Sequence, residues 1–84
     1  MPWILSVRDK VYKQLKVFPA DYSRRILSVF ELMREDPYSG DIVSLGEANF
    51  RRRIGDYRIF FELRKKEQII YIYKVERRTS KTYR

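Results

Sequence analysis

The spacing of apolar residues changes once along this chain, and that change restricts the fold more than any other feature. Up to residue 36, apolar side chains recur at intervals of three and four, the period of an amphipathic helix. From Phe50 onward they alternate with polar side chains, the period of a strand with one buried face. A chain of 84 residues has room for one domain. The sequence therefore predicts a single α+β domain over residues 1–84, with most of its strands after its helices.

Prolines and polar segments divide the two patterns into elements. Pro19 cannot continue a helix, and Pro37 disfavours helical backbone at Asp36. Two helices with almost no linker between them are expected to form an antiparallel hairpin. The expected ranges are 3–7 (strand), 7–18 and about 20–36 (helices), 37–49 (loop), and 50–54, 57–64 and 69–77 (strands). The predicted architecture is β-α-α-β-β-β, a helical hairpin packed on one face of a small, mainly antiparallel sheet.

The dipeptide Gly55-Asp56 sets the register of the first predicted β-hairpin. A two-residue turn with glycine first is typical of type II′. Such a turn places Arg53 opposite Arg58 and Arg51 opposite Phe60. Because side chains alternate between the faces of a strand, these four residues are expected on the face that the helices leave open.

A second, polar turn at 65–68 extends the same reasoning to the last strand. It pairs Arg64 with Ile69, and simple alternation then places Tyr71, Tyr73, Val75 and Arg77 on the open face. The open face is therefore predicted to combine arginines with flanking aromatic rings: Arg51, Arg53, Arg58 and Arg77 with Phe60 and Tyr73. Arg52 has the opposite parity, so its side chain must reach past the sheet edge or the strand must contain a bulge.

Charge is distributed as unevenly as the apolar residues. The chain has 19 Lys and Arg against 11 Asp and Glu, a net charge of +8. Residues 1–49 are balanced, so the whole excess lies in residues 50–84. This concentration favours a surface that faces a polyanion such as nucleic acid. The alternative is a solvated sheet face with scattered charge.

Several function classes are excluded by residues that the sequence lacks. There is no cysteine and no histidine, so the usual zinc sites and Ser-His-Asp or Cys-His catalysis are excluded. No apolar run approaches the roughly 20 residues of a membrane span, and the N-terminal segment is too short for a signal peptide. We expect a cytoplasmic protein with no zinc site of the usual kind and no small-molecule cofactor.

Two segments resemble the RelE/ParE superfamily of toxin–antitoxin toxins, and particularly its RelE branch. Phe50–Ile59 is similar to the family's strand–turn–strand core, in which basic residues precede a short turn and Tyr-Arg. The tail has a strand-end arginine, Arg77, followed six residues later by a tyrosine, Tyr83. The opening strand and two helices also fit, so the resemblance covers essentially the whole chain.

The resemblance implies an endoribonuclease that cuts mRNA in the ribosomal A site, near 16S rRNA, without metal, and that forms a complex with a cognate antitoxin protein. Arg51 and Arg53 match the basic pair of the first hairpin strand, commonly lysines in the family. The implied catalytic residues are Arg51, Arg53, Arg58, Arg77 and Tyr83, and the implied RNA-binding residues are Arg52, Phe60, Tyr73, Arg78 and Lys81.

The chemistry of RNA cleavage suggests a role for each catalytic residue. Attack by the 2′-hydroxyl needs an activated hydroxyl, a balanced phosphorane charge and a protonated leaving oxygen. Arg53 and Arg58 would bind the scissile phosphate and Arg51 would neutralise developing charge. Arg77 would stabilise or protonate the leaving oxygen, and Tyr83 would orient the 2′-hydroxyl, stack a base or act as the base. Guanidinium is a poor proton donor, so dependence on the ribosome is expected.

Two other functions remain open from the sequence. One is a ParE-like gyrase poison with no nuclease activity, although the spacing of Arg77 and Tyr83 favours the nuclease. The other is an RNA-binding module without catalysis. The double-stranded RNA-binding domain is also small and basic, but its sheet lies between its helices, whereas here both helices come first.

Overall fold

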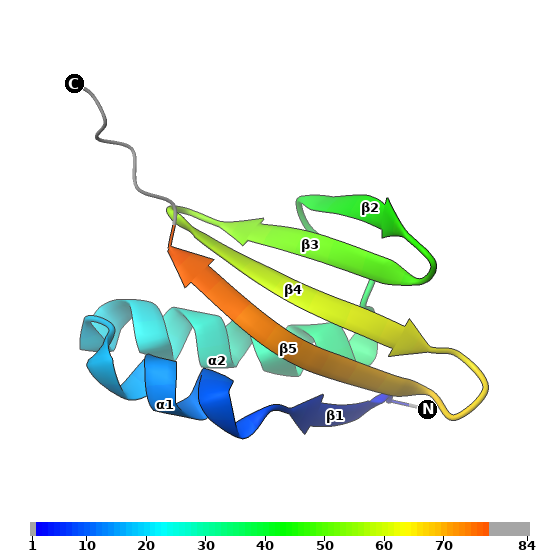
Figure 1. The fold of residues 1–84 in the computed structure, drawn as a ribbon, viewed down its shortest axis with the longest axis horizontal. Helices are drawn as coiled ribbons and strands as arrows, with labels where there is room; N and C mark the ends of the chain where they lie inside the picture. The colour runs from blue at the N-terminus through cyan, green and yellow to red at the C-terminus, as the bar shows by residue number, and fades with distance from the viewer. Residues whose placement is uncertain (1, 78–84) are drawn as a thin grey trace.

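The computed structural model describes residues 2–77 and contains two helices and five strands in that part of the chain (Figure 1). The elements are β1 (Ile4–Val7), α1 (Asp9–Val17), α2 (Ala20–Glu35), β2 (Ile42–Gly46), β3 (Asn49–Ile54), β4 (Tyr57–Arg64) and β5 (Ile69–Arg77). The α+β class, the helical hairpin and the order of the predicted elements are confirmed. The last two strands have the predicted bounds.

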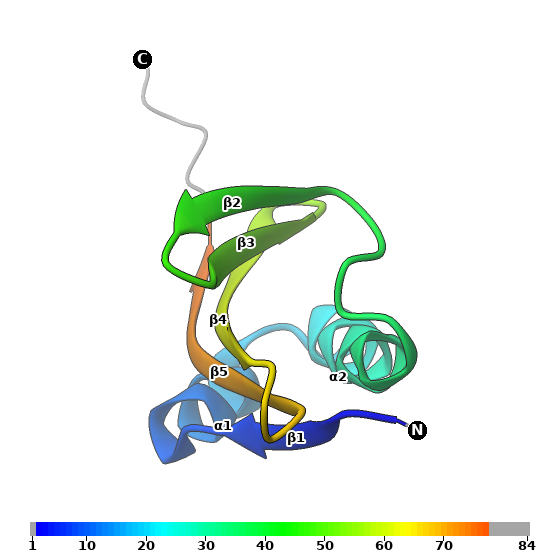
Figure 2. The same cartoon turned by 90° about the vertical axis from the view of Figure 1, so that its right-hand side faces the viewer.

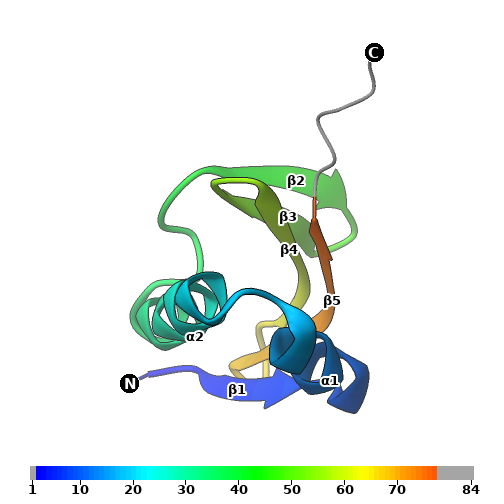
Figure 3. The same cartoon turned by 90° about the vertical axis from the view of Figure 1, so that its left-hand side faces the viewer.

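The five strands form one sheet in the order β1-β5-β4-β3-β2. All neighbours are antiparallel except β1 and β5, which run parallel. The sheet curls strongly, and α2 lies along its concave side while α1 lies beside β1 and β5 (Figures 2 and 3). The helical hairpin therefore covers one face and leaves the convex face open, as the sequence predicts.

The helix ends follow from local sequence. Helix α1 begins later than expected because Arg8 is still extended, with φ −63° and ψ 138°. It ends at Val17, ahead of Pro19, and Pro19 in turn precedes the first residue of α2. Helix α2 stops at Glu35, since Asp36 before Pro37 is extended.

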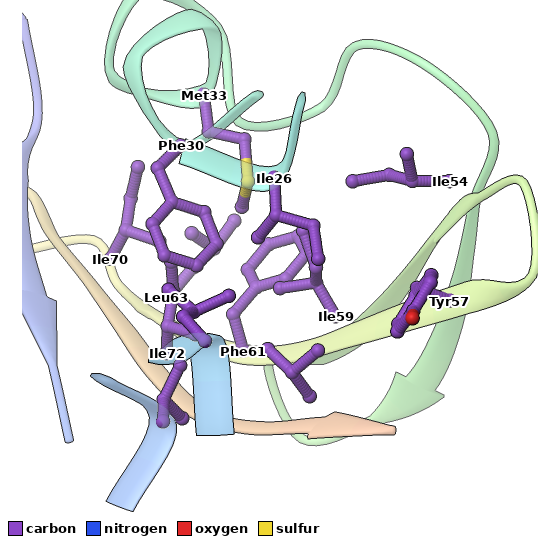
Figure 4. Close-up of a cluster of buried hydrophobic side chains, with 13 residues drawn as sticks. Ile26, Phe30, Met33, Ile54, Tyr57, Ile59, Phe61, Leu63, Ile70 and Ile72 are labelled. Carbon is purple, nitrogen blue, oxygen red and sulfur yellow. The ribbon is translucent and has the colours of Figure 1, made fainter. Parts of the chain in front are cut away.

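The core lies between the helices and the concave side of the sheet (Figure 4). Along β4, buried and partly exposed residues alternate, which gives the strand one apolar face. The helices contribute apolar side chains that recur at intervals of three and four, as the sequence predicts. Its fully or nearly buried members are Val11, Leu15, Ile26, Phe30, Met33, Ile54, Tyr57, Ile59, Phe61, Leu63, Ile70, Ile72 and Val75.

The expectation of a loop over 37–49 is wrong in its second half, because residues 42–46 form β2 along the outer edge of β3. The β2–β3 turn has positive φ at Glu47 (50°) and Ala48 (64°), a conformation that these residues rarely adopt. Neither residue is a turn former, and β2 is short and largely exposed. The sequence therefore lacks both the turn signal and the clean alternation that predict a hairpin.

The predicted faces of β5 are correct only for its first half. The β4–β5 register pairs Arg64 with Ile69 as expected, then shifts between Phe60 and Phe61, which leaves Tyr73 as an extra residue. A bulge of one residue reverses the parity of everything beyond it. Val75 is consequently buried, at 1% exposure, and Arg77 pairs with the core residue Tyr57. The prediction that Val75 and Arg77 share the open face is wrong for this reason.

Candidate nucleic-acid interface

Three arginines meet on the open face at the β3–β4 hairpin. Arg53 lies opposite Arg58, and Arg51 lies opposite Phe60, in the predicted register. Gly55 opens the turn between the strands with φ +55°, as a type II′ turn requires of its first residue. We call this group, Arg51, Arg53 and Arg58, the arginine cleft. Together with Asp41 and Val43 these arginines line a hollow of about 270 Å³.

The arginine cleft has more positive charge than its protein partners balance. The Arg58 guanidinium lies 3.7 Å from the Glu76 carboxylate, and Arg53 Nε donates a hydrogen bond to the Gly55 carbonyl at 3.4 Å. Within residues 2–77, neither Arg51 nor Arg53 forms an ion pair. Like charges on directly opposite strand positions are destabilising. A phosphate, which arginine binds through paired N–H donors, would relieve that repulsion.

Aromatic rings continue the open face beside the arginine cleft. Phe60 and Tyr73 have ring centroids 6.5 Å apart, and Tyr71 stacks on Tyr73 at 6.1 Å. Tyr73 is held across the sheet by its hydroxyl, which donates to Asn49 Oδ1 at 3.0 Å. Lys74 Nζ lies 4.9 Å from the centroid of the Phe60 ring. Rings beside cations suit unpaired bases and their phosphates.

Arg52 lies on the opposite face from the arginine cleft. The β3–β4 register is regular, so of the two alternatives raised by its parity the bulge is excluded. The side chain instead reaches under the preceding loop, where Nη1 donates to Ser39 Oγ at 3.1 Å. Burial lowers the pKa of Arg52 below its usual value, and the Asp36 carboxylate partly opposes this. Arg52 therefore pins the loop that leads into β2.

Arg77 is also separated from the arginine cleft, because the bulge turns it toward the helix side. Its guanidinium carbon lies 5.8 Å from the centroid of the Tyr57 ring. The other predicted residues of the tail, Arg78, Lys81 and Tyr83, lie outside the described residues. The structure thus brings together Arg51, Arg53, Arg58, Phe60 and Tyr73 from the predicted set.

Sequence reasoning missed the residues that β2 and the bulge bring to the open face. Asp41 and Val43 form one wall of the arginine cleft, and the Asp41 carbonyl accepts the backbone N–H of Arg53 at 2.9 Å. On β5, the bulge replaces Val75 and Arg77 with Lys74 and Glu76. No local sequence signal predicts strand β2 or the bulge in β5, because both depend on how the strands pair.

In the described range 2–77, no group of three or more acidic side chains is arranged to hold a metal ion. None of the helices in that range is long and apolar enough to cross a membrane.

Comparison with known proteins gives one family and a consistent set of folds. The family model described as the ParE toxin of the type II toxin–antitoxin system parDE matches residues 6–81. Comparison with curated protein sequences gives no match.

Solved structures of RelE toxins have a similar fold over nearly the whole chain. A RelE–RelB complex from Pyrococcus horikoshii has a TM-score of 0.85 and 26% identity, and the match covers 96% of this chain and 100% of that chain. The RelBE2 toxin–antitoxin complex from Mycobacterium tuberculosis has a TM-score of 0.81 at 16% identity, with 93% and 100% covered. The isolated E. coli RelE toxin has a TM-score of 0.80 at 10% identity, with 95% and 88% covered.

Proposed function

This chain belongs to the ParE toxin family of type II toxin–antitoxin systems, within the RelE/ParE superfamily, and we propose that it is a ribosome-dependent, metal-independent endoribonuclease that cuts mRNA in the A site. The observation that carries the proposal is the arginine cleft beside an aromatic surface on the open face. Like charges set opposite one another in a sheet are destabilising. A phosphate bound between Arg53 and Arg58 would restore the balance of charge.

The arrangement suits the stabilisation of a phosphorane. Arg53 and Arg58 would hold the scissile phosphate between adjacent strands, and Arg51 would neutralise charge as the 2′-oxygen attacks phosphorus and the bond to the 5′-oxygen breaks. Phe60, opposite Arg51, would stack a neighbouring base. Fixed strand positions hold these groups ready, so little reorganisation is needed during reaction.

The arginine cleft is poorly suited to proton transfer. A guanidinium remains protonated near neutral pH and donates its proton poorly. Arg77 lies round the sheet edge from the arginine cleft, so we assign the phosphate to Arg51, Arg53 and Arg58 alone. We propose that Tyr83 orients or deprotonates the 2′-hydroxyl. The ribosome, with 16S rRNA beside the A site, would supply the remaining positioning and proton transfer.

The proposal includes an antitoxin partner and action in the cytoplasm. The P. horikoshii and M. tuberculosis structures are complexes of a toxin with its antitoxin. This chain has a net charge of +8, concentrated after residue 49. An antitoxin segment rich in Asp and Glu would cover that surface and block access of RNA.

A second candidate is supported by the family model itself, which describes a ParE toxin. On that reading the chain poisons gyrase and cuts no RNA. The two candidates differ in what the arginine cleft does, so removal of its charge separates them.

The test is induction of the chain in growing cells, with mRNA 5′ ends mapped by primer extension. We expect new cuts inside translated codons that disappear in Arg53→Ala/Arg58→Ala. The matched control is Lys65→Ala/Lys66→Ala, which removes the same charge from the exposed β4–β5 turn and should still cut. Growth arrest with intact mRNA and broken DNA would instead establish the gyrase poison.

A further inference from the structure

We propose that a second cationic cleft, between the start of α1 and the end of β5, binds phosphates of single-stranded RNA outside the scissile position. This inference rests on the proposed function for its biological setting, although the binding that it describes can be measured without cleavage. The α1–β5 cleft has a volume of about 450 Å³, and Arg8, Lys10, Lys74 and Arg77 all line it.

Hydrogen bonds to the edge of β5 fix the position of α1 in this cleft. Strand β1 pairs with β5 only as far as Ile72. Beyond that point the N–H of Arg8 donates to the Ile72 carbonyl at 3.0 Å, and Gln14 Nε2 donates to the Val75 carbonyl at 3.0 Å. These bonds occupy acceptors that an added strand would need. The cleft is therefore unsuited to a partner that binds by β-strand addition.

The charge of the α1–β5 cleft is strongly positive. Among residues 2–77 its one acidic lining residue is Glu76, which already lies 3.7 Å from the Arg58 guanidinium and 3.5 Å from Lys74 Nζ. In the described part of the chain, Arg8, Lys10 and Arg77 form no ion pair. Three exposed cations around one hollow repel each other, and a phosphate group placed among them would remove that repulsion.

The bulge in β5 places this cleft next to the arginine cleft, on the other side of Glu76. By reversing the parity after Tyr73, it turns Arg77 toward α1 and Lys74 toward Phe60. Glu76 contacts both Arg58 and Lys74, so the two clefts meet at this carboxylate. A path of basic side chains, crossed by the Glu76 carboxylate, thus runs from β3 over β4 and round β5 to α1.

An RNA strand matches this path better than an acidic peptide does. Its phosphates repeat along the strand, and its unpaired bases can use apolar and aromatic surfaces. The α1–β5 cleft offers Phe18 and Tyr73 for that purpose, next to its cations. An acidic helix would satisfy the charge but would leave the aromatic surface beside Lys74 without a role.

The test is the affinity of the full chain for a labelled 12-residue oligouridine, measured by fluorescence anisotropy over a range of salt concentrations. The variant Arg8→Ala/Lys10→Ala removes two exposed cations from the cleft and leaves the proposed catalytic residues intact. Each phosphate contact contributes about 0.7 to the slope of log affinity against log salt for single strands. We expect the slope to fall by about 1.4 and affinity at 0.1 M salt to fall about tenfold or more.

Lys13→Ala/Lys16→Ala is the matched control. It removes the same charge from helix α1, at exposed positions that do not line the cleft, and its affinity should stay within about twofold of the unmodified chain. Equal losses in the two variants would overturn the proposal, because net charge alone would then explain binding.

Two further results separate this inference from the proposed function. If Arg53→Ala/Arg58→Ala weakens oligouridine binding and Arg8→Ala/Lys10→Ala does not, the second site is refuted while the nuclease proposal stands. If Arg8→Ala/Lys10→Ala keeps its RNA affinity but loses affinity for polyglutamate, the cleft recognises acidic protein and the inference is overturned. If Arg8→Ala/Lys10→Ala loses RNA affinity and the unmodified chain cuts no mRNA in cells, the second site is supported and the nuclease is refuted.

Discussion

Gly40 is the position where a single added methyl group tests the packing behind the arginine cleft. It has φ +82°, and a Cβ built there would lie 2.6 Å from Cζ of Arg52. Carbon atoms in contact are normally about 3.5–4.0 Å apart, so the guanidinium must move. That movement breaks the hydrogen bond from Arg52 to Ser39 Oγ.

Gly46 supplies the matched control for Gly40. Its φ is +94°, but a Cβ there meets no atom within 4 Å. Both substitutions by alanine therefore carry the cost of a left-handed backbone, about 1–2 kcal/mol. Only Gly40→Ala also breaks the charged hydrogen bond from Arg52 to Ser39 Oγ. We take that loss as about 1.5 kcal/mol, the lower end of the usual range for charged hydrogen bonds, because the site is half-buried. We expect Gly40→Ala to lower the free energy of unfolding by about 3 kcal/mol and Gly46→Ala by about 1.5 kcal/mol.

Urea unfolding followed by circular dichroism measures both losses. In an Arg52→Ala background the clash is absent, so the two glycine substitutions should then cost the same. Equal costs in the unmodified chain, or a difference that persists in the Arg52→Ala background, would refute the assignment of Arg52 as the side chain that pins this loop. The loop also carries Asp41, whose carbonyl accepts the N–H of Arg53, so Gly40→Ala should weaken RNA cleavage more than Gly46→Ala does.

Three more predictions test the core, the bulge and the charge. Tyr57→Phe should change the free energy of unfolding by less than about 1 kcal/mol, because the buried hydroxyl has no hydrogen-bond partner among residues 2–77; a larger loss in thermal unfolding would reveal a missing partner. Val75→Asp should lower the free energy of unfolding by more than about 3 kcal/mol, since it buries an unpaired charge. Lys74→Ser should lower it by less than about 0.5 kcal/mol. Similar losses in the two variants would contradict the bulge. In RNA-binding titrations, Arg53→Ala/Arg58→Ala should lower the salt slope by about 1.4, and an unchanged slope would place the phosphate elsewhere.

The parts of the fold that sequence predicts are those set by local chemistry. Pro19 cannot continue α1, Pro37 ends α2 by keeping Asp36 extended, and Gly55 provides the positive φ that its turn requires. The turn then fixes the whole β3–β4 register, including Arg53 opposite Arg58. The three arginines of the arginine cleft could be assigned to the open face from the sequence because they lie within five residues of that turn.

The parts that sequence does not predict depend on pairing between distant segments. The segment Ile69–Val75 is apolar or aromatic at all positions but one, so alternation cannot reveal which residue is extra. Only the paired strand, with Val75 and Tyr57 both buried, shows that Tyr73 forms the bulge. Strand β2 is missed for a similar reason, since its stability comes from β3 rather than from its own residues. The α1–β5 cleft joins residues 55 to 69 positions apart, from Phe18 and Tyr73 to Arg8 and Arg77.

The most direct test of the nuclease is the purified chain added to ribosomes carrying an mRNA with a defined A-site codon. We expect a single cut within that codon in the presence of a metal chelator at a concentration that leaves the ribosomes intact, and no cut in free mRNA. The cut should be lost in Arg53→Ala/Arg58→Ala but not in Lys65→Ala/Lys66→Ala. Intact mRNA on these ribosomes, with the same preparation blocking gyrase supercoiling, would contradict the nuclease and establish the gyrase poison.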